Sequence, residues 1–88
     1  MFGDSEMNCV ADAITTAVHQ SETGEIHGDF DFLVDVVCHE YGWGEGQKVR
    51  DFIAALDLEK LLEKWPVEFF RAMDGSMHFV DVRAICEH

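Results

Sequence analysis

Four acidic residues between positions 29 and 41 occupy ligand positions of a calcium-binding loop. They are Asp29, Asp31, Asp35 and Glu40. However, Leu33 and Val34 stand where that loop requires an oxygen ligand and a glycine. Without the glycine the chain cannot make the turn that brings the carboxylates together. We therefore expect no calcium site and interpret these acids as the solvated side of a helix.

Histidine and cysteine are the other candidate metal ligands. The chain has five histidines and three cysteines but no CxxC or HxxxH pair of the kind that binds zinc. Cys38 and His39 are adjacent, so on a helix they point to different sides. His27 and His39 would need partners brought by folding. We therefore predict surface imidazoles, no metal site and no other cofactor.

Nucleophilic catalysis by Cys9, Cys38 or Cys86 would require a histidine partner and a stabilised thiolate. Apolar neighbours and the negative field of the chain disfavour a thiolate, so we predict small buried thiols. Gly44 and Gly46 lack the preceding strand and the further glycine of a nucleotide-binding loop. No carboxylate pair stands out by an apolar environment. We therefore expect no enzymatic activity.

Charge is distributed unevenly along the 88 residues. There are 18 acidic residues against 6 Lys and Arg, which gives a formal net charge of −12. Residues 1–47 contain ten acids and no Lys or Arg, whereas the rest of the chain contains eight acids and all six bases. Such a surface attracts a basic partner. It argues against direct binding to nucleic acid or to an anionic membrane, because both need Lys and Arg.

The length predicts a single compact acidic domain over residues 1–88. The first ten residues have neither the basic nor the apolar region of a signal peptide. No apolar run approaches the roughly 20 residues of a membrane span. The odd number of cysteines favours free thiols in a reducing compartment. We therefore expect a cytoplasmic protein.

Apolar spacing predicts helices over residues 5–20 and 29–41, joined by a loop at 21–28. The core-facing side of the second helix carries Phe30, Leu33, Val34, Val37 and Tyr41. Its opposite ridge carries Asp31, Asp35 and His39. Gly28 or Asp29 is expected to start this helix, and Gly42 to end it. The whole chain is organised around this element.

A third helix follows the glycine-rich turn 42–46 and is predicted from the spacing of Val49 to Leu56. A fourth run over residues 58–65, with Asp57 as its cap, ends at or bends before Pro66. For residues 67–82 two interpretations remain. A helix from Pro66 to Gly75 followed by a short strand is one of them. A β-hairpin with a two-residue turn at Asp74-Gly75 is the other, and we favour it.

This hairpin would pair Phe70 with Phe79 and Glu68 with Asp81. The predicted fold class is accordingly α+β, with three to four short helices and a C-terminal β-hairpin. The alternative is a small all-α bundle.

The predicted partner-binding surface combines acids with a few apolar side chains. Phe32 and Val36 fall beside the acidic ridge, away from the main apolar stripe. Trp43 is expected to close the end of the core, or else to lie exposed at a binding surface. The predicted surface consists of Asp29, Asp31, Asp35, Glu40, Glu22, Glu25, Phe32, Val36 and Trp43.

In size, acidity and lack of catalytic motifs the chain resembles the small DNA-mimic inhibitors of phages and mobile elements, among them anti-CRISPR proteins. The resemblance is to a class, and it rests on overall charge, on the base-free residues 1–47 and on the acidic ridge. It implies a non-enzymatic inhibitor that occupies the basic nucleic-acid-binding groove of a target such as a CRISPR-Cas effector.

Two other interpretations remain open. One is a small adaptor or regulatory subunit that binds through an apolar patch of Phe32, Val36 and Trp43. The other is that the acids only solvate the surface.

Overall fold

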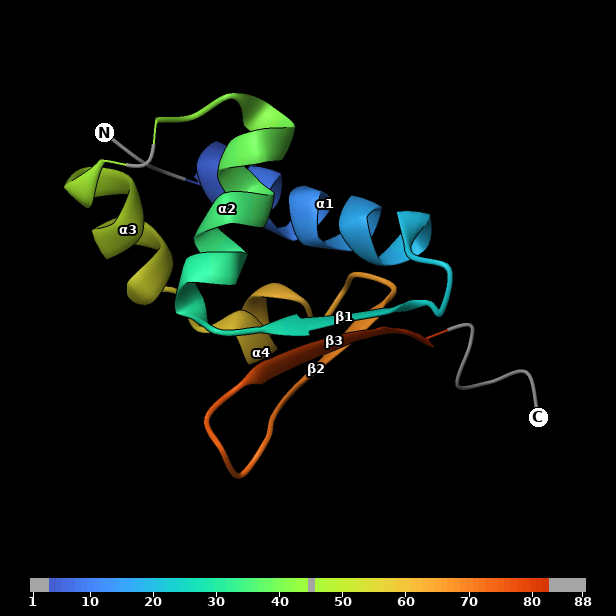
Figure 1. The fold of residues 1–88 in the computed structure, drawn as a ribbon. Helices are drawn as coiled ribbons and strands as arrows, with labels where there is room; N and C mark the ends of the chain where they lie inside the picture. The colour runs from blue at the N-terminus through green and yellow to red at the C-terminus, as the bar shows by residue number, and fades with distance from the viewer. Residues whose placement is uncertain (1–3, 45, 83–88) are drawn as a thin grey trace.

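The residues that the computed structural model describes, 4–44 and 46–82, form four helices and a three-stranded antiparallel sheet (Figure 1). The helices are α1 (Asp4–Gln20), α2 (Phe30–Tyr41), α3 (Gln47–Ala54) and α4 (Leu58–Leu61). The strands are β1 (Glu25–Gly28), β2 (Val67–Arg71) and β3 (Met77–Asp81), in the order β1-β3-β2. The predicted α+β class is confirmed, and the all-α alternative is wrong. No helix in these ranges is long and apolar enough to cross a membrane.

An apolar core lies between the helices and one face of the sheet (Figure 1). Its fully buried members include Val10, Ile14, Val18, Val34, Val37 and Phe79. In α2 the predicted core side is confirmed at Leu33, Val34 and Val37, while Phe30 packs half-buried at its edge. Tyr41 is 37% exposed and lies at the rim of the core instead.

Local capping sets the ends of α2 and the start of α4. The Asp29 carboxylate accepts a hydrogen bond from the backbone N–H of Phe32 at 2.9 Å, and Gly42 ends α2 in a left-handed conformation. The Asp57 carboxylate accepts from the backbone N–H of Lys60 at 3.4 Å. These caps are the predicted ones.

The fourth helix is shorter than predicted, because α4 ends at Leu61 and residues 62–66 form turns. The N–H groups of Glu63 and Trp65 bond to carbonyls three residues back. The helical conformation is disfavoured for the residue before a proline. Pro66 therefore accounts for the change from α-helix to turns with hydrogen bonds three residues back.

The predicted loop over residues 21–28 is wrong in its second half, where β1 forms. Glu25–Gly28 pair with residues 77–80 of β3, and Ile26 lies opposite Phe79. The four-residue strand is too short for a periodic signal. It forms because β3 lies beside it, as Figure 1 shows, and because Ile26 packs against the core.

The C-terminal hairpin is confirmed, but its predicted two-residue turn is wrong. Ala72 and Ser76 close a three-residue loop, with Gly75 in a left-handed conformation at φ 90°. Phe69 therefore lies opposite Phe79, and Phe70 lies opposite His78.

This shift of one residue turns every side chain of β2 to the other face. Phe69 now packs against the core, while Phe70 is 49% exposed on the outer face. The predicted Phe70–Phe79 and Glu68–Asp81 pairs do not form. Glu68 lies opposite Val80 instead, so two like charges do not face each other.

Candidate functional site

The acids of the predicted surface on and around α2 divide into two groups. Asp29 caps the helix, and Asp31 forms an ion pair with Arg50 of α3. Asp35 and Glu40 are exposed, and within residues 4–44 and 46–82 neither has a hydrogen-bond or ion-pair partner. Asp35 and Glu40 are thus the two carboxylates of α2 that are available to an external partner.

The apolar members of the predicted surface contribute little exposed area. Phe32 and Val36 are half-buried, and the Phe32 ring packs so closely over Gly28 that a Cβ atom there would lie 2.5 Å from its Cγ. Trp43 packs against the core, which confirms the favoured interpretation of this residue. The exposed large apolar side chains in the described part of the chain are Tyr41, Phe70 and Met73.

The two remaining acids of the predicted surface lie apart from α2. Glu22 is exposed in the turn after α1. Glu25 is on β1, directly before Ile26, whose side chain packs against the core. The Glu25 side chain therefore projects to the opposite face of the sheet, which the helices do not cover. The structure therefore does not assemble one continuous site from all nine predicted residues.

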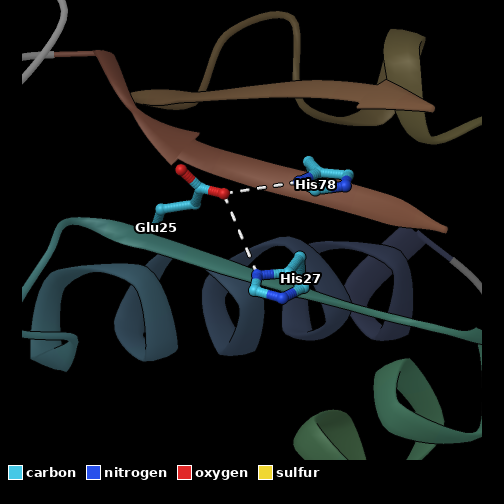
Figure 2. Close-up of side chains that lie close together, drawn as sticks. All are labelled: Glu25, His27 and His78. Atoms are coloured by element: carbon cyan, nitrogen blue, oxygen red, sulfur yellow. Dashed lines mark hydrogen bonds and ion pairs between the residues drawn. The ribbon is translucent and has the colours of Figure 1, made fainter. Parts of the chain in front are cut away.

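A cluster that the sequence did not predict lies on this outer face of the sheet (Figure 2). Glu25 and His27 are two residues apart on β1, so both side chains project to the same side. His27 lies directly opposite His78 on β3. The Glu25 Oε1 atom is 3.3 Å from Nδ1 of His78 and 3.9 Å from Nδ1 of His27. We call these three residues the Glu25 cluster.

Neighbouring side chains hold the His78 ring in place. Its Nε2 atom lies 3.1 Å from the Ser76 hydroxyl, which lies 2.6 Å from a carboxylate oxygen of Asp74. The ring also stacks between those of His27 and Phe70, with centroids 5.1 Å and 5.0 Å away. Hydrogen bonds from the Ser76 hydroxyl and amide hold the pKa of Asp74 below its usual range.

Ser76, His78 and Glu25 are connected like a nucleophile, a general base and an orienting acid. In such a triad the serine proton is directed at the imidazole. Here the Ser76 hydroxyl is closer to Asp74, at 2.6 Å, than to His78, at 3.1 Å. The hydroxyl therefore donates to the carboxylate, and its proton is not directed at the imidazole as it is in a triad.

The remaining candidate ligands and nucleophiles stay apart. His39 is exposed on α2, as expected of a surface imidazole. The prediction of a buried thiol is confirmed for Cys38 and wrong for Cys9, which is only half-buried. Cys86 lies outside the described residues.

The Glu25 cluster was not predicted from the sequence, because His78 is 51 residues from His27 and because β1 was not predicted. The one signal present was the Glu-Ile-His spacing, which places two ligands on one side of a strand. Comparisons of this chain with protein-family models, with curated proteins and with solved structures found no match.

Proposed function

We propose that this chain is a non-enzymatic inhibitor that binds a protein. Its acidic surface would occupy the basic nucleic-acid-binding groove of a target such as a CRISPR-Cas effector. One observation carries the proposal: a base-free segment of ten acids exposes Asp35 and Glu40 on α2 without a partner among the described residues. The resemblance to DNA-mimic inhibitors supplies the target class. The proposal includes a cytoplasmic location, where such effectors act.

The position of these carboxylates supports recognition of a basic surface. An exposed carboxylate stays hydrated in the free protein. It also accelerates association with a surface of opposite charge. The cap at Asp29 and the ion pair at Asp31 already satisfy the first turn of α2. Charge in the middle and last turns of the helix is therefore left for the partner.

The test is competition between this protein and DNA. A fluorescently labelled target duplex is bound to each of a panel of Cas effector–guide RNA complexes, and the protein is titrated in while anisotropy is followed. We expect displacement of the duplex from at least one effector. The displacement should weaken steeply between about 50 mM and about 200 mM salt, because the attraction is between exposed charges.

The variant D35N/E40Q removes two of the unpartnered charges. We expect it to require at least about tenfold more protein for displacement, which corresponds to about 1.4 kcal/mol. The matched control is E59Q/E63Q, which removes two exposed acids from the base-containing half of the chain. No displacement in the whole panel, or equal loss in both double variants, would contradict the proposal.

The adaptor interpretation has weaker support, since Phe32, Val36 and Trp43 are all half-buried. An interface built on them would bind with little dependence on salt and without competition from DNA. The same titration therefore separates the two interpretations.

A further inference from the structure

The geometry points to a divalent transition-metal site formed by Glu25, His27 and His78 on the outer face of the sheet. Each residue offers one ligand atom, and these atoms lie within 4.8 Å of one another. As Figure 2 shows, the two imidazoles and the carboxylate converge from two neighbouring strands. The site is separate from the acidic side of α2 on which the proposed function rests.

The ligand set suits a metal of intermediate softness. Two imidazole nitrogens and one carboxylate oxygen are a common donor set for Zn²⁺ and also fit Co²⁺, Ni²⁺ and Cu²⁺. Calcium and magnesium prefer oxygen ligands alone. Three protein ligands leave one position of a tetrahedral ion for water or for another ligand.

The distances require adjustment, because the three ligand atoms are only within 4.8 Å of one another. Ligands about 2.0–2.1 Å from a tetrahedral zinc ion lie roughly 3.3 Å from one another. Glu25 and His78 already meet this separation at 3.3 Å, whereas His27 Nδ1 lies 3.9 Å from the carboxylate. The two stacked rings must tilt toward each other, and His27 has the freedom to do so because its side chain is 65% exposed.

The side chains that hold the His78 ring also support a metal site. A metal-bound imidazole almost always donates its other N–H to a neighbouring acceptor, which fixes the tautomer and the ring orientation. With a metal bound, Nε2–H of His78 would donate to the Ser76 hydroxyl, which donates to Asp74, and the lone pair of Nδ1 would face the ion. The Phe70 ring stacks on His78 from the side away from His27.

The negative net charge of the chain would by itself attract cations. The test must therefore distinguish binding at the Glu25 cluster from nonspecific binding to scattered carboxylates. The full-length protein is titrated with ZnCl₂ by calorimetry in a non-chelating buffer with millimolar MgCl₂, which occupies scattered carboxylates. We expect one zinc ion per chain and an increase in thermal stability with zinc concentration, because the ion binds the folded state.

The variants H27Q, H78Q and E25Q should each weaken zinc binding at least about tenfold. S76A removes the hydroxyl that supports His78 and also its hydrogen bond to Asp74, and it should weaken zinc binding by about tenfold. The matched control is H39Q, an exposed histidine on α2 outside the cluster, which should bind zinc as the wild type does. D35N/E40Q should also bind normally, so that failure of the proposed function and failure of this site are distinguishable.

A zinc ion could bind to cysteine instead of the Glu25 cluster, and the absorption spectrum of Co²⁺ distinguishes these two sites. Cobalt bound by Glu25, His27 and His78 should show no thiolate-to-metal charge-transfer absorption, whereas a cysteine site would show it. We expect H27Q to fold as the wild type does, since His27 is largely exposed, and circular dichroism checks this. Absence of zinc binding, binding unchanged in H27Q and H78Q, equal loss in H39Q, or a thiolate spectrum would each overturn the proposal.

Discussion

The Tyr41 hydroxyl at the end of α2 donates a 2.5 Å hydrogen bond to the Asp12 carboxylate on α1. The two residues are 29 positions apart, so this contact ties the C-terminal end of α2 to the middle of α1. The hydrogen bond to Asp12, followed by partial removal from water, raises the pKa of Tyr41 well above its ordinary value of 10.

Tyr41→Phe should lower the free energy of unfolding by about 1 kcal/mol at neutral pH, because it removes one hydrogen bond at a partly exposed site. Urea unfolding followed by tryptophan fluorescence measures the loss. Asp12→Asn tests the pairing, since in a double-mutant cycle the two losses should not add. Additive losses would show that the contact does not contribute.

The sign of the pH dependence of this contact follows from the raised pKa. The contribution of Tyr41 is complete below pH 10 and is lost as the pH rises from 10 through the higher pKa of the folded state. Tyr41 is the only tyrosine in the sequence, so phenolate absorbance reports it alone. The titration midpoint should lie above 10 in the wild type and move down toward 10 in Asp12→Asn.

Gly28→Ala should destabilise the fold by about 1–3 kcal/mol, as overpacking of a filled site does. A Cβ atom at Gly28 would lie 2.5 Å from Cγ and 2.7 Å from Cβ of Phe32, so the whole side chain must move. Gly44→Ala is the matched control, because nothing lies within 4 Å of its added Cβ. Thermal unfolding compares the two variants, and an equal change in both would refute the clash.

Asp74→Asn should make the free energy of unfolding less dependent on pH in the acidic range. Ser76 donates both its amide and its hydroxyl hydrogen bond to Asp74, which lowers the pKa of that carboxyl from its ordinary value of 3.8. Its stabilising contribution is therefore complete above that value and is lost as the pH falls through the lower pKa of the folded state.

The urea midpoint of the wild type should exceed that of Asp74→Asn at pH 7, and the difference should shrink below about pH 4. Unfolding curves at a series of pH values measure it. Glu63→Gln, at an exposed acid outside the turn, controls for general charge effects. A difference that stays constant down to pH 3 would show that the charge on Asp74 is not responsible.

Local sequence signals were sufficient for the existence of the four helices, although not for the end of α4. The core side of α2, its cap at Asp29 and its end at Gly42 follow from side-chain spacing and from hydrogen bonds within a few residues. The existence of the hairpin was also local, because Asp74-Gly75 and the flanking apolar residues favour a turn. The charge asymmetry that motivates the proposed function is likewise a property of the sequence alone.

Tertiary structure decided the register of the hairpin, the presence of β1 and the Glu25 cluster. Which of Phe69 and Phe70 faces inward depends on the turn type and on packing against Phe79, and a shift of one residue exchanges them. The cluster then depends on β1 pairing with β3, which brings His27 beside His78. Pairings between residues so far apart depend on burial in a shared core, and no short window of sequence contains that information.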